Sequence, residues 1–362
     1  MHAPLSPTAC VGLLAASCLL LGCGSGGAPT DYLGAGGAGA GAGTTTSVEH
    51  ASPPRPGEAR PGDGDGTAVF ALTKLWLGGG SGDAATGPSF AKLGYDLDGR
   101  LSTEASTDLC RPRRGALPVD VYVDGERGID NAFGRAVLPI LTAAAPTAQA
   151  QLNAGLAAGQ MTLLFAIDAL GSGASYRPLT ARAYAGSSLG APPKLDGSDR
   201  WPIAPESLLD PGDPQSARVR FDQSYLVQNV WVSGPGGALS LQLSLGGTTT
   251  TLTLGSAIIT MTLDEAHKAG TSGVIAGILP TATLIEVLRK VAGTIDPGLC
   301  AGPLIDSIAR QLEAASDILV DGTQDPAKDC DGISVGLGFE ATRAALGPVA
   351  SASAPAADPC AP

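Results

Sequence analysis

The feature that most constrains the fold is a stretch of alternating leucines near the middle of the chain. Leucine occupies every second position from Leu239 to Leu245 and polar residues lie between them, which is the period-two pattern of a strand with one buried face. Gly246-Gly247 follows, and two adjacent glycines are typical of a two-residue hairpin turn. This turn would place Leu239 opposite Leu254, so the leucines of both strands share one face.

A second two-residue turn is predicted at Gly255-Ser256, because glycine suits the first position of a type II′ turn. It would place Leu252 opposite Ile259 and keep the same face apolar. Residues 238–263 are therefore predicted to form a three-stranded meander with one apolar face. Such a face has to pack against a second layer.

The rest of the folded part of the chain is predicted to be mainly β. We predict a two-layer antiparallel β-sandwich, of the jelly-roll or lamin-G-like kind, over residues 67–344. Two amphipathic helices, near 283–292 and 303–320, form a helical pair inserted before the last strand. Residues 345–362 are predicted to be an Ala/Pro-rich tail.

The first 22 residues are predicted to be a lipoprotein signal peptide. They contain an apolar run of signal-peptide length and end in the residues LLGC at positions 20–23. This ending resembles the bacterial lipobox, which implies acylation of Cys23 with fatty acids such as palmitate. Residue 24 is Gly and not Asp, so we predict an outer membrane lipoprotein that contacts the membrane through its lipid anchor.

Residues 23–66 are rich in Gly, Ala and Pro. Such composition cannot bury a core, so we predict a disordered tether between the anchor and the folded domain. A flexible chain of this length spans about 35–40 Å.

Cysteine usage indicates an oxidising compartment. Of the seven cysteines, Cys10 and Cys18 lie in the signal peptide and Cys23 in the lipobox. An even number remains, which predicts two disulfides. Three connectivities are open, and we favour Cys300–Cys330 with Cys110–Cys360.

Charge excludes one class of partner. The chain has 34 acidic and 22 Lys or Arg side chains, for a net charge of −12. No basic stripe is present to neutralise phosphates, so no nucleic-acid partner is predicted.

Few residues suggest catalysis. After the signal peptide the only histidines are His50 and His267, which excludes a zinc site built from several histidines. Residues 186–190 match G-x-S-x-G, but Pro192-Pro193 prevent the helix that a nucleophile elbow requires. We interpret that motif as a glycine-rich loop.

Short-spaced carboxylates are candidate calcium ligands, because calcium prefers oxygen ligands gathered by backbone turns. None of them matches an EF-hand, and Asp-Gly pairs are also ordinary turn residues. The predicted calcium ligands are Asp96, Asp98, Asp124, Asp130 and Asn131.

Three blocks, Gly94–Gly99, Gly128–Gly134 and Cys330–Phe339, resemble recurring blocks of an uncharacterised family of predicted envelope lipoproteins from myxobacteria. The resemblance covers most of residues 67–340. It implies an envelope lipoprotein, and it carries no catalytic residues.

The predicted function is a lipid-anchored extracytoplasmic protein that binds a glycan or a protein, since loops at strand ends commonly carry sites. The alternative is a secreted hydrolase that acts on glycans with a carboxylate pair, Asp130 with Asp96 or Asp98. A third hypothesis, a purely structural surface protein, predicts no pocket.

Overall fold

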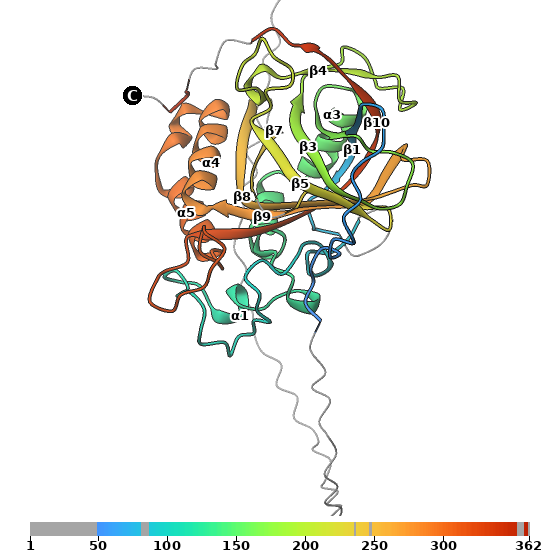
Figure 1. Cartoon of the computed structure of the whole chain (residues 1–362). Helices are drawn as coiled ribbons and strands as arrows, with labels where there is room; N and C mark the ends of the chain where they lie inside the picture. The colour runs from blue at the N-terminus through green and yellow to red at the C-terminus, as the bar shows by residue number, and fades with distance from the viewer. Residues whose placement is uncertain (1–48, 81–86, 235–236, 246–247, 353–357, 361–362) are drawn as a thin grey trace, which may run out of the picture. The chain divides into compact units, whose positions relative to one another are not determined.

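The computed structural model of the chain describes residues 49–80, 87–234, 237–245, 248–352 and 358–360 (Figure 1). All of them belong to one unit, Val48–Pro362. Ten strands make up most of its regular structure. They are β1 (Thr67–Trp76), β2 (Thr162–Asp168), β3 (Tyr176–Gly186), β4 (Arg200–Ile203), β5 (Val219–Val227), β6 (Val230–Val232), β7 (Gly237–Leu245), β8 (Thr248–Leu263), β9 (Ala269–Pro280) and β10 (Gly332–Val349).

The helices are fewer and mostly short. The α-helices are α1 (Pro118–Val121), α2 (Leu138–Ala144), α3 (Ala148–Ala157), α4 (Thr281–Ile295) and α5 (Pro303–Ala314). Single turns of 3₁₀-helix and one π-helical turn connect them, namely η1 (Phe90–Lys92), η2 (Glu126–Gly128), η3 (Phe133–Val137), η4 (Pro205–Ser207) and η5 (Pro297–Cys300).

Eight strands close into an antiparallel β-barrel in the order β1, β2, β3, β5, β6, β8, β9, β10. The ring closes because β10 also pairs with β1, with Val69 opposite Ala344 and Trp76 opposite Gly338. The prediction of a two-layer β-sandwich is therefore wrong. A sandwich leaves edge strands on two sheets, whereas each of these eight strands has a neighbour on both sides.

The two remaining strands are not members of this closed ring. β4 runs parallel to the end of β10, and β7 pairs with the first half of β8. β10 thereby continues to Val349, beyond the predicted domain limit at residue 344.

The register of the predicted hairpin is confirmed. Leu239 lies opposite Leu254 and Leu245 opposite Thr248, while the turn at 246–247 lies outside the described residues. The second predicted turn, at Gly255-Ser256, is wrong, because β8 continues straight through it. The pairing of β8 shifts there and the φ of Ser256 is 48°, so these two residues form a bulge and not a reversal.

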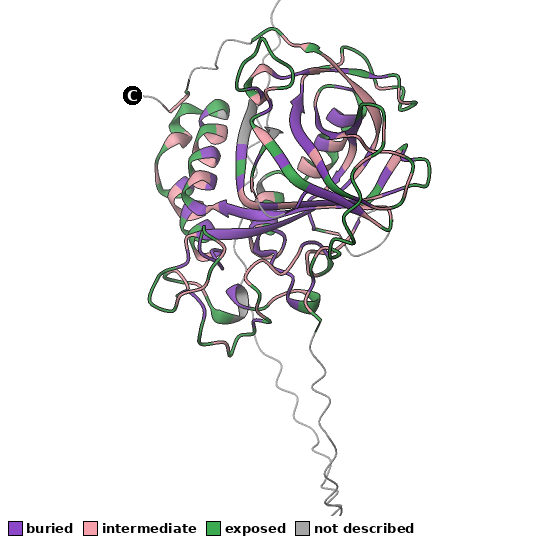
Figure 2. Cartoon of the chain, in the orientation of Figure 1, coloured by how far each residue is buried: buried purple, intermediate pink, exposed green. Residues whose placement is uncertain are grey.

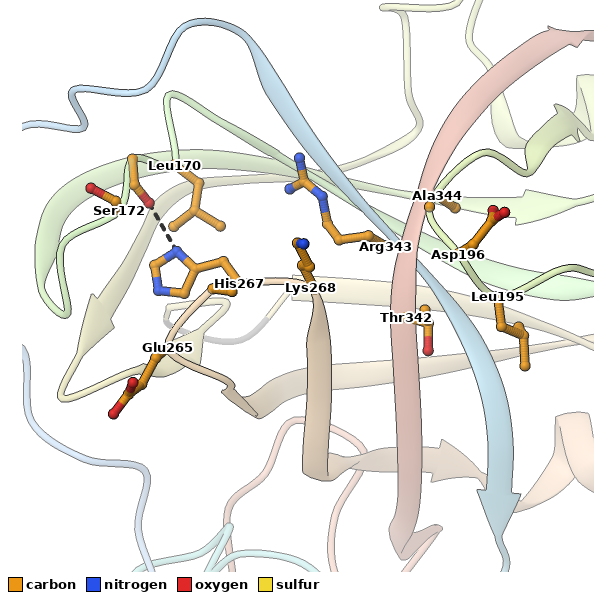
Figure 3. A pocket seen from close by; sticks show the side chains of 13 residues that line it. Leu170, Ser172, Leu195, Asp196, Glu265, His267, Lys268, Thr342, Arg343 and Ala344 are labelled. Carbon is orange, nitrogen blue, oxygen red and sulfur yellow. Dashed lines mark hydrogen bonds between the residues drawn. The ribbon is translucent and has the colours of Figure 1, made fainter.

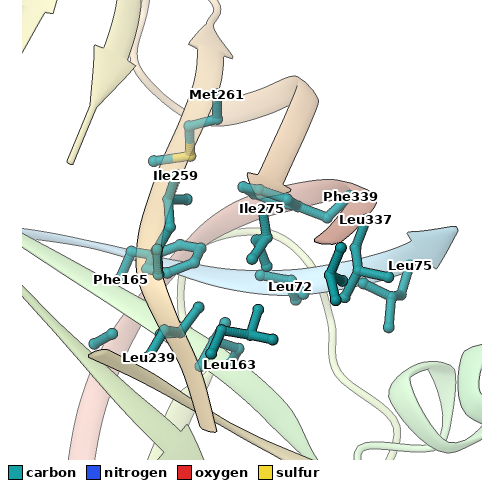
Figure 4. Close-up of a cluster of buried hydrophobic side chains, with 14 of the residues drawn as sticks. Leu72, Leu75, Leu163, Phe165, Leu239, Ile259, Met261, Ile275, Leu337 and Phe339 are labelled. Atoms are coloured by element: carbon teal, nitrogen blue, oxygen red, sulfur yellow. The ribbon is translucent and has the colours of Figure 1, made fainter. Parts of the chain in front are cut away.

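Large side chains fill the barrel interior (Figure 4). The ring of Phe165 lies 5.6 Å from the rings of both Trp231 and Phe339, measured between centroids. Leu252 and Ile259 are buried in the same core, as the alternation predicts, whereas the side chain of Leu241 lies outside the described part. Figure 2 shows that burial follows the barrel strands, while the outer faces of the helices are exposed.

Helix α3 covers one end of β1. Its Asn153 and Gln149 side chains accept hydrogen bonds from the backbone N–H groups of Leu75 and Leu77, each at 2.8 Å. These bonds satisfy donors at the end of the strand, where no neighbouring strand reaches them.

The predicted helical pair before the last strand is confirmed. Helices α4 and α5 lie beside each other at one side of the barrel (Figure 1), and Leu284, Val287 and Leu312 join the main core. No helix among the described residues has the length and apolar character needed to cross a membrane.

The structure places residues 49–66, whose composition predicted a tether, against the barrel. Ala51 is buried; its N–H donates to the carbonyl of Arg127 and its carbonyl accepts from the N–H of Asp96, each at 2.8 Å. The hydroxyl of Tyr225 donates to the carbonyl of Pro54 at 2.6 Å. The folded unit therefore begins about 20 residues before the predicted boundary at residue 67.

Two disulfides are present, as predicted, but the favoured pairing is wrong. Cys110 pairs with Cys330 and Cys300 pairs with Cys360. Both members of the first bridge are fully buried beside Leu319. The loop around Cys110 lies against the segment that leads into β10, where the N–H of Arg111 donates to the carbonyl of Lys328 and its carbonyl accepts from the N–H of Cys330. This contact between distant segments decides the pairing.

Candidate functional site

The inward face of β10 changes from apolar to charged at one end of the barrel. Phe339 and Ala341 are buried in the core, and Arg343 follows at the next inward position, opposite Phe70 of β1. The guanidinium carbon of Arg343 lies 5.4 Å from the centre of the Phe70 ring, within the range of a cation–π contact. The alternation that fills the barrel therefore also places Arg343 at its mouth.

The hairpin between β8 and β9 brings Lys268 to the same mouth. The carboxylate of Asp264 accepts hydrogen bonds from the N–H groups of Lys268 at 2.6 Å and Ala269 at 3.2 Å. His267 takes up the left-handed backbone of the turn, with a φ of 50°. The N–H of Arg343 donates to the carbonyl of Lys268 at 2.8 Å, so the two cationic residues lie on neighbouring segments.

His267 anchors this hairpin to the loop that follows β2. Only 6% of the residue is exposed, and its Nδ1 atom donates to the carbonyl of Gly171 at 2.8 Å (dashed line in Figure 3). Its Nε2 atom lies 3.4 Å from Oδ1 of Asn229. His267 therefore holds two loops together at this strand end.

A cavity of about 600 Å³ opens beside these residues. Its wall combines the cationic groups with apolar side chains, including Leu170, Leu195 and Ala344. Pockets for small molecules have volumes of about 300–1,000 Å³ and combine apolar walls with a few polar groups. Because the core side chains fill the barrel itself, the cavity lies at its mouth.

The charges around the cavity are arranged unevenly. Figure 3 shows the side chains of Arg343 and Lys268 directed into the space, while the carboxylates of Glu265 and Asp196 point away from Arg343. In the part of the chain that the structure describes, neither Arg343 nor Lys268 forms an ion pair. The cavity therefore presents two cationic side chains that form no ion pair with a carboxylate of the described residues.

Arg343 is the more buried of the two cations. Burial lowers the pKa of its guanidinium, because a low-polarity environment disfavours the charged form. A guanidinium still remains protonated at neutral pH. The barrel mouth thus holds a permanent positive charge that is partly removed from water.

A second group of polar residues lies in the loops on another side of the barrel. Asp96, Asp98 and Asp130 each offer an oxygen within 4.8 Å of the others, a spacing that a calcium ion with oxygen ligands at about 2.3–2.6 Å would tolerate. Among the described residues, Asp124 is not one of the carboxylates of this group, and the side-chain oxygen of Asn131 accepts a hydrogen bond from the N–H of Gly134 at 2.9 Å. The structure thus brings together three of the five predicted calcium ligands.

Hydrogen bonds already use many of these oxygens. Asp130 accepts from the N–H of Leu97 at 2.6 Å. Asp96 pairs with His50 and accepts from the N–H of Gly99 at 2.6 Å. Asp124 accepts from the N–H of another loop residue, Ser102, at 2.5 Å. These carboxylates fix the loops that carry them.

Asn131 connects one of these loops to β10. Its amide group donates to the carbonyls of Leu93 at 2.8 Å and Gly336 at 3.1 Å. A side chain at Gly336 would place its Cβ atom 2.0 Å from the oxygen of Leu93. Glycine on β10 therefore allows the loop to approach closely enough for Asn131 to bind it.

Burial raises the pKa of several carboxyl groups in and beside these loops. Burial, followed by repulsion from Asp98, raises the pKa of Asp130 well above its ordinary value. Burial is also the main cause that raises the pKa of Asp124 to about 7 and that of Asp317 to about 6. Sequence reasoning missed Asp317, because only the fold brings it to this cluster.

This geometry does not favour glycoside hydrolysis. Retaining glycosidases hold two carboxyl groups about 5–5.5 Å apart across an open cleft. Here the carboxylate oxygens lie within 4.8 Å of one another and Asp130 is 5% exposed. The predicted pairs of Asp130 with Asp96 or Asp98 are brought together, but in a hydrogen-bonded loop.

The G-x-S-x-G match at residues 186–190 follows the end of β3 and leads into an irregular loop. Ser188 is exposed, and its hydroxyl accepts a hydrogen bond from the N–H of Gly190 at 3.2 Å. No helix follows it in the described loop, so the interpretation as a glycine-rich loop is confirmed.

Comparison of the chain with protein families, with curated proteins and with solved structures finds no match. The resemblance to myxobacterial envelope lipoproteins therefore stays a prediction. The site has to be interpreted from its own geometry.

Sequence reasoning missed both cations of the barrel mouth. A signal for Arg343 was present, because the alternation of Phe339 and Ala341 continues to residue 343. No comparable pattern marks Lys268, which depends on the fold for its place beside β10.

Proposed function

We propose that this chain is an exported, lipid-anchored envelope protein that binds a small molecule at the mouth of its barrel. The cavity of about 600 Å³ beside Arg343, Lys268 and His267 carries this proposal. Its size suits a small molecule or a short glycan better than a protein surface, which would require a wider interface. It also argues against a purely structural role, which predicted no pocket.

The place of action follows from other features. Two disulfides are consistent with an extracytoplasmic location. The residues LLGC at positions 20–23 support an anchor at Cys23, and an outer membrane location fits the absence of Asp at position 24. In this proposal the lipid anchor holds the barrel at the membrane and the cavity meets its ligand there.

Blocking the cavity tests the binding function. Ser172 is an exposed residue of its wall, so Ser172→Trp would place a bulky ring at the edge of the cavity without disturbing the core. Ser188→Trp changes an exposed loop residue that does not line the cavity, and it serves as the matched control. A library of small metabolites is screened against the full-length protein by ligand-observed NMR.

We expect compounds that bind the unmodified protein and the Ser188→Trp control to lose binding in Ser172→Trp. Compounds that bind all three proteins equally, or a library without any binder, would contradict the proposal. The anchor is tested separately by mass spectrometry of the mature N-terminus. Acylated Cys23 supports it, and an unmodified Cys23 or cleavage elsewhere rules it out.

A further inference from the structure

We propose that the cavity at the barrel mouth recognises a small organic anion, whose carboxylate or phosphate group binds between the guanidinium of Arg343 and the ammonium of Lys268. This inference rests on the proposed function, because it names the chemical class of the ligand for the same site. Four observations carry it.

The first observation is the position of Arg343 along β10. It continues the inward series of Phe339 and Ala341, and it faces Phe70 across the β1–β10 ladder. An inward position of a filled barrel would ordinarily hold an apolar residue, because moving a charge out of water is unfavourable without a partner. A bound anion would offset the cost of placing this guanidinium at an inward position.

The second observation is the proximity of a like charge. The backbone hydrogen bond from Arg343 to Lys268 holds the two residues together. Both side chains reach the cavity (Figure 3), and two cations sharing one space repel each other. A negative group bound between them would turn this repulsion into two attractions.

The third observation is that the Arg343 guanidinium and the hairpin backbone that carries Lys268 are both held in place. The Phe70 ring supports the guanidinium from one side. Asp264 and His267 fix the hairpin of Lys268 through hydrogen bonds to the backbone and to Gly171. A planar guanidinium held in place can form two parallel hydrogen bonds with a carboxylate or a phosphate.

The fourth observation is the character of the remaining wall. Leu170 and Leu195 contribute apolar surface, whereas Glu265 and Asp196 carry their carboxylates away from Arg343. A ligand with one anionic group and an uncharged body fits this division. The outward carboxylates would repel a second negative group near the rim.

Matched probes test the ligand class by calorimetry with the full-length protein in detergent. One set is glucuronate, glucose 6-phosphate and glucose, and the other is hexanoate, hexyl phosphate and hexanol. Each set compares a carboxylate, a phosphate and their neutral counterpart. The variant is Lys268→Met with Arg343→Met. Its control is Lys92→Met with Arg310→Met, which removes the same two charge types from exposed positions elsewhere.

We expect at least one anion to bind tenfold more tightly than its neutral counterpart. That anion should lose at least tenfold in affinity in the Lys268/Arg343 variant and keep its affinity in the control. Anions that bind no better than their neutral counterparts, or equally well to both variants, would overturn the assignment. Circular dichroism and thermal unfolding of both variants show whether each is folded.

NMR signals of Leu170 and Leu195 separate the two proposals. If neutral compounds shift these signals while anions do not, the cavity binds a ligand but the anionic class is wrong. If no compound of either set shifts them and the metabolite library also gives no binder, the proposed binding function fails as well.

Discussion

Arg343 lies opposite Phe70 in the pairing of β1 with β10, and its guanidinium carbon is 5.4 Å from the centre of the Phe70 ring. The pair marks the point where the inward face of the barrel changes from apolar to cationic. The charge of Arg343 is therefore carried by a strand that is paired with its neighbour, and not by a loop. Sites built on such rigid elements hold their geometry better than sites on free loops.

Replacing Arg343 by Met should leave the protein as stable as before or more stable, by about 0–1 kcal/mol. Methionine keeps the apolar contact of the arginine stem with Phe70 and removes a half-buried charge that has no carboxylate partner among the described residues. Urea denaturation measures the free energy of unfolding.

Phe70→Ala provides the contrast, because it removes a fully buried ring and should lower the free energy of unfolding by about 3–5 kcal/mol. A loss of more than about 2 kcal/mol in Arg343→Met would indicate that the arginine is a structural residue.

Closure of the barrel predicts the hydrogen exchange of β1. Residues 67–71 of this strand pair with β2, and residues 69–76 pair with β10. Backbone amides directed to either neighbour should therefore exchange slowly, at rates close to global unfolding. Exchange measured by NMR at single residues checks this. Fast exchange of every second amide of β1 would show an open edge and contradict the closed barrel.

Local signals predicted the parts of the fold that depend on neighbouring residues. Leucine alternation and Gly246-Gly247 together specified the pairing of Leu239 with Leu254, because a short turn and one buried face leave a single register. Gly255-Ser256 carried the same turn signal, and there the chain forms a bulge. Its continuation pairs with β6 and β9, a tertiary contact that no local pattern contains.

Contacts between distant segments could not be predicted. The ring closes through β1 and β10, which pair Val69 with Ala344, and alternation alone is the same in a sandwich and a barrel. The disulfide pairing failed for the same reason, since Cys110 meets Cys330 across 220 residues. In the acidic loops, short spacing was enough to bring Asp96 and Asp98 together.

Raised pKa values predict that stability falls as the pH rises. Asp124 has a pKa of about 7 in the folded protein against an ordinary value of 3.8. The folded state therefore binds more protons than the unfolded state between about pH 4 and pH 7, and its stability declines over this range. Asp124→Asn should reduce the slope of the free energy of unfolding against pH by the equivalent of up to about one bound proton. The variant should be more stable than the unmodified protein at pH 8.

Urea denaturation in EGTA at pH 4 to 8 measures this effect. Asp321→Asn is the control, because hydrogen bonds with Thr323 lower the pKa of that exposed carboxyl. Asp321 therefore affects the pH dependence of stability only below about pH 4. Above pH 5 the free energy of unfolding of Asp321→Asn should change with pH as it does in the unmodified protein. Equal slopes for all three proteins would show that Asp124 titrates normally.

The disulfide pairing predicts both a peptide map and a loss of stability. Proteolysis without reduction should release fragments that link Cys110 to Cys330 and Cys300 to Cys360. Replacing Cys110 and Cys330 by Ala should lower the free energy of unfolding by about 2–5 kcal/mol, since this bridge restricts the unfolded chain. Fragments joining Cys300 to Cys330 would contradict the fold around the start of β10.

Calcium at the acidic loops can be tested through its competition with protons. Asp96, Asp98 and Asp130 hold oxygens within 4.8 Å of one another, and burial raises the pKa values of the last two. A bound divalent cation would offset the repulsion among the three carboxylates. Because it binds only deprotonated carboxylates, it competes with protons. We expect millimolar Ca²⁺ to raise the thermal midpoint at pH 8 relative to EGTA, and to have less effect at pH 5.

Magnesium should act more weakly, because it demands a smaller octahedral site and gives up water reluctantly. Asp98→Asn should abolish the effect of calcium, whereas Asp213→Asn, which changes an exposed loop carboxylate elsewhere, should retain it. Calorimetry without heat of binding, together with equal midpoints in Ca²⁺ and EGTA at pH 8, would leave hydrogen bonding to the loops as the role of these carboxylates.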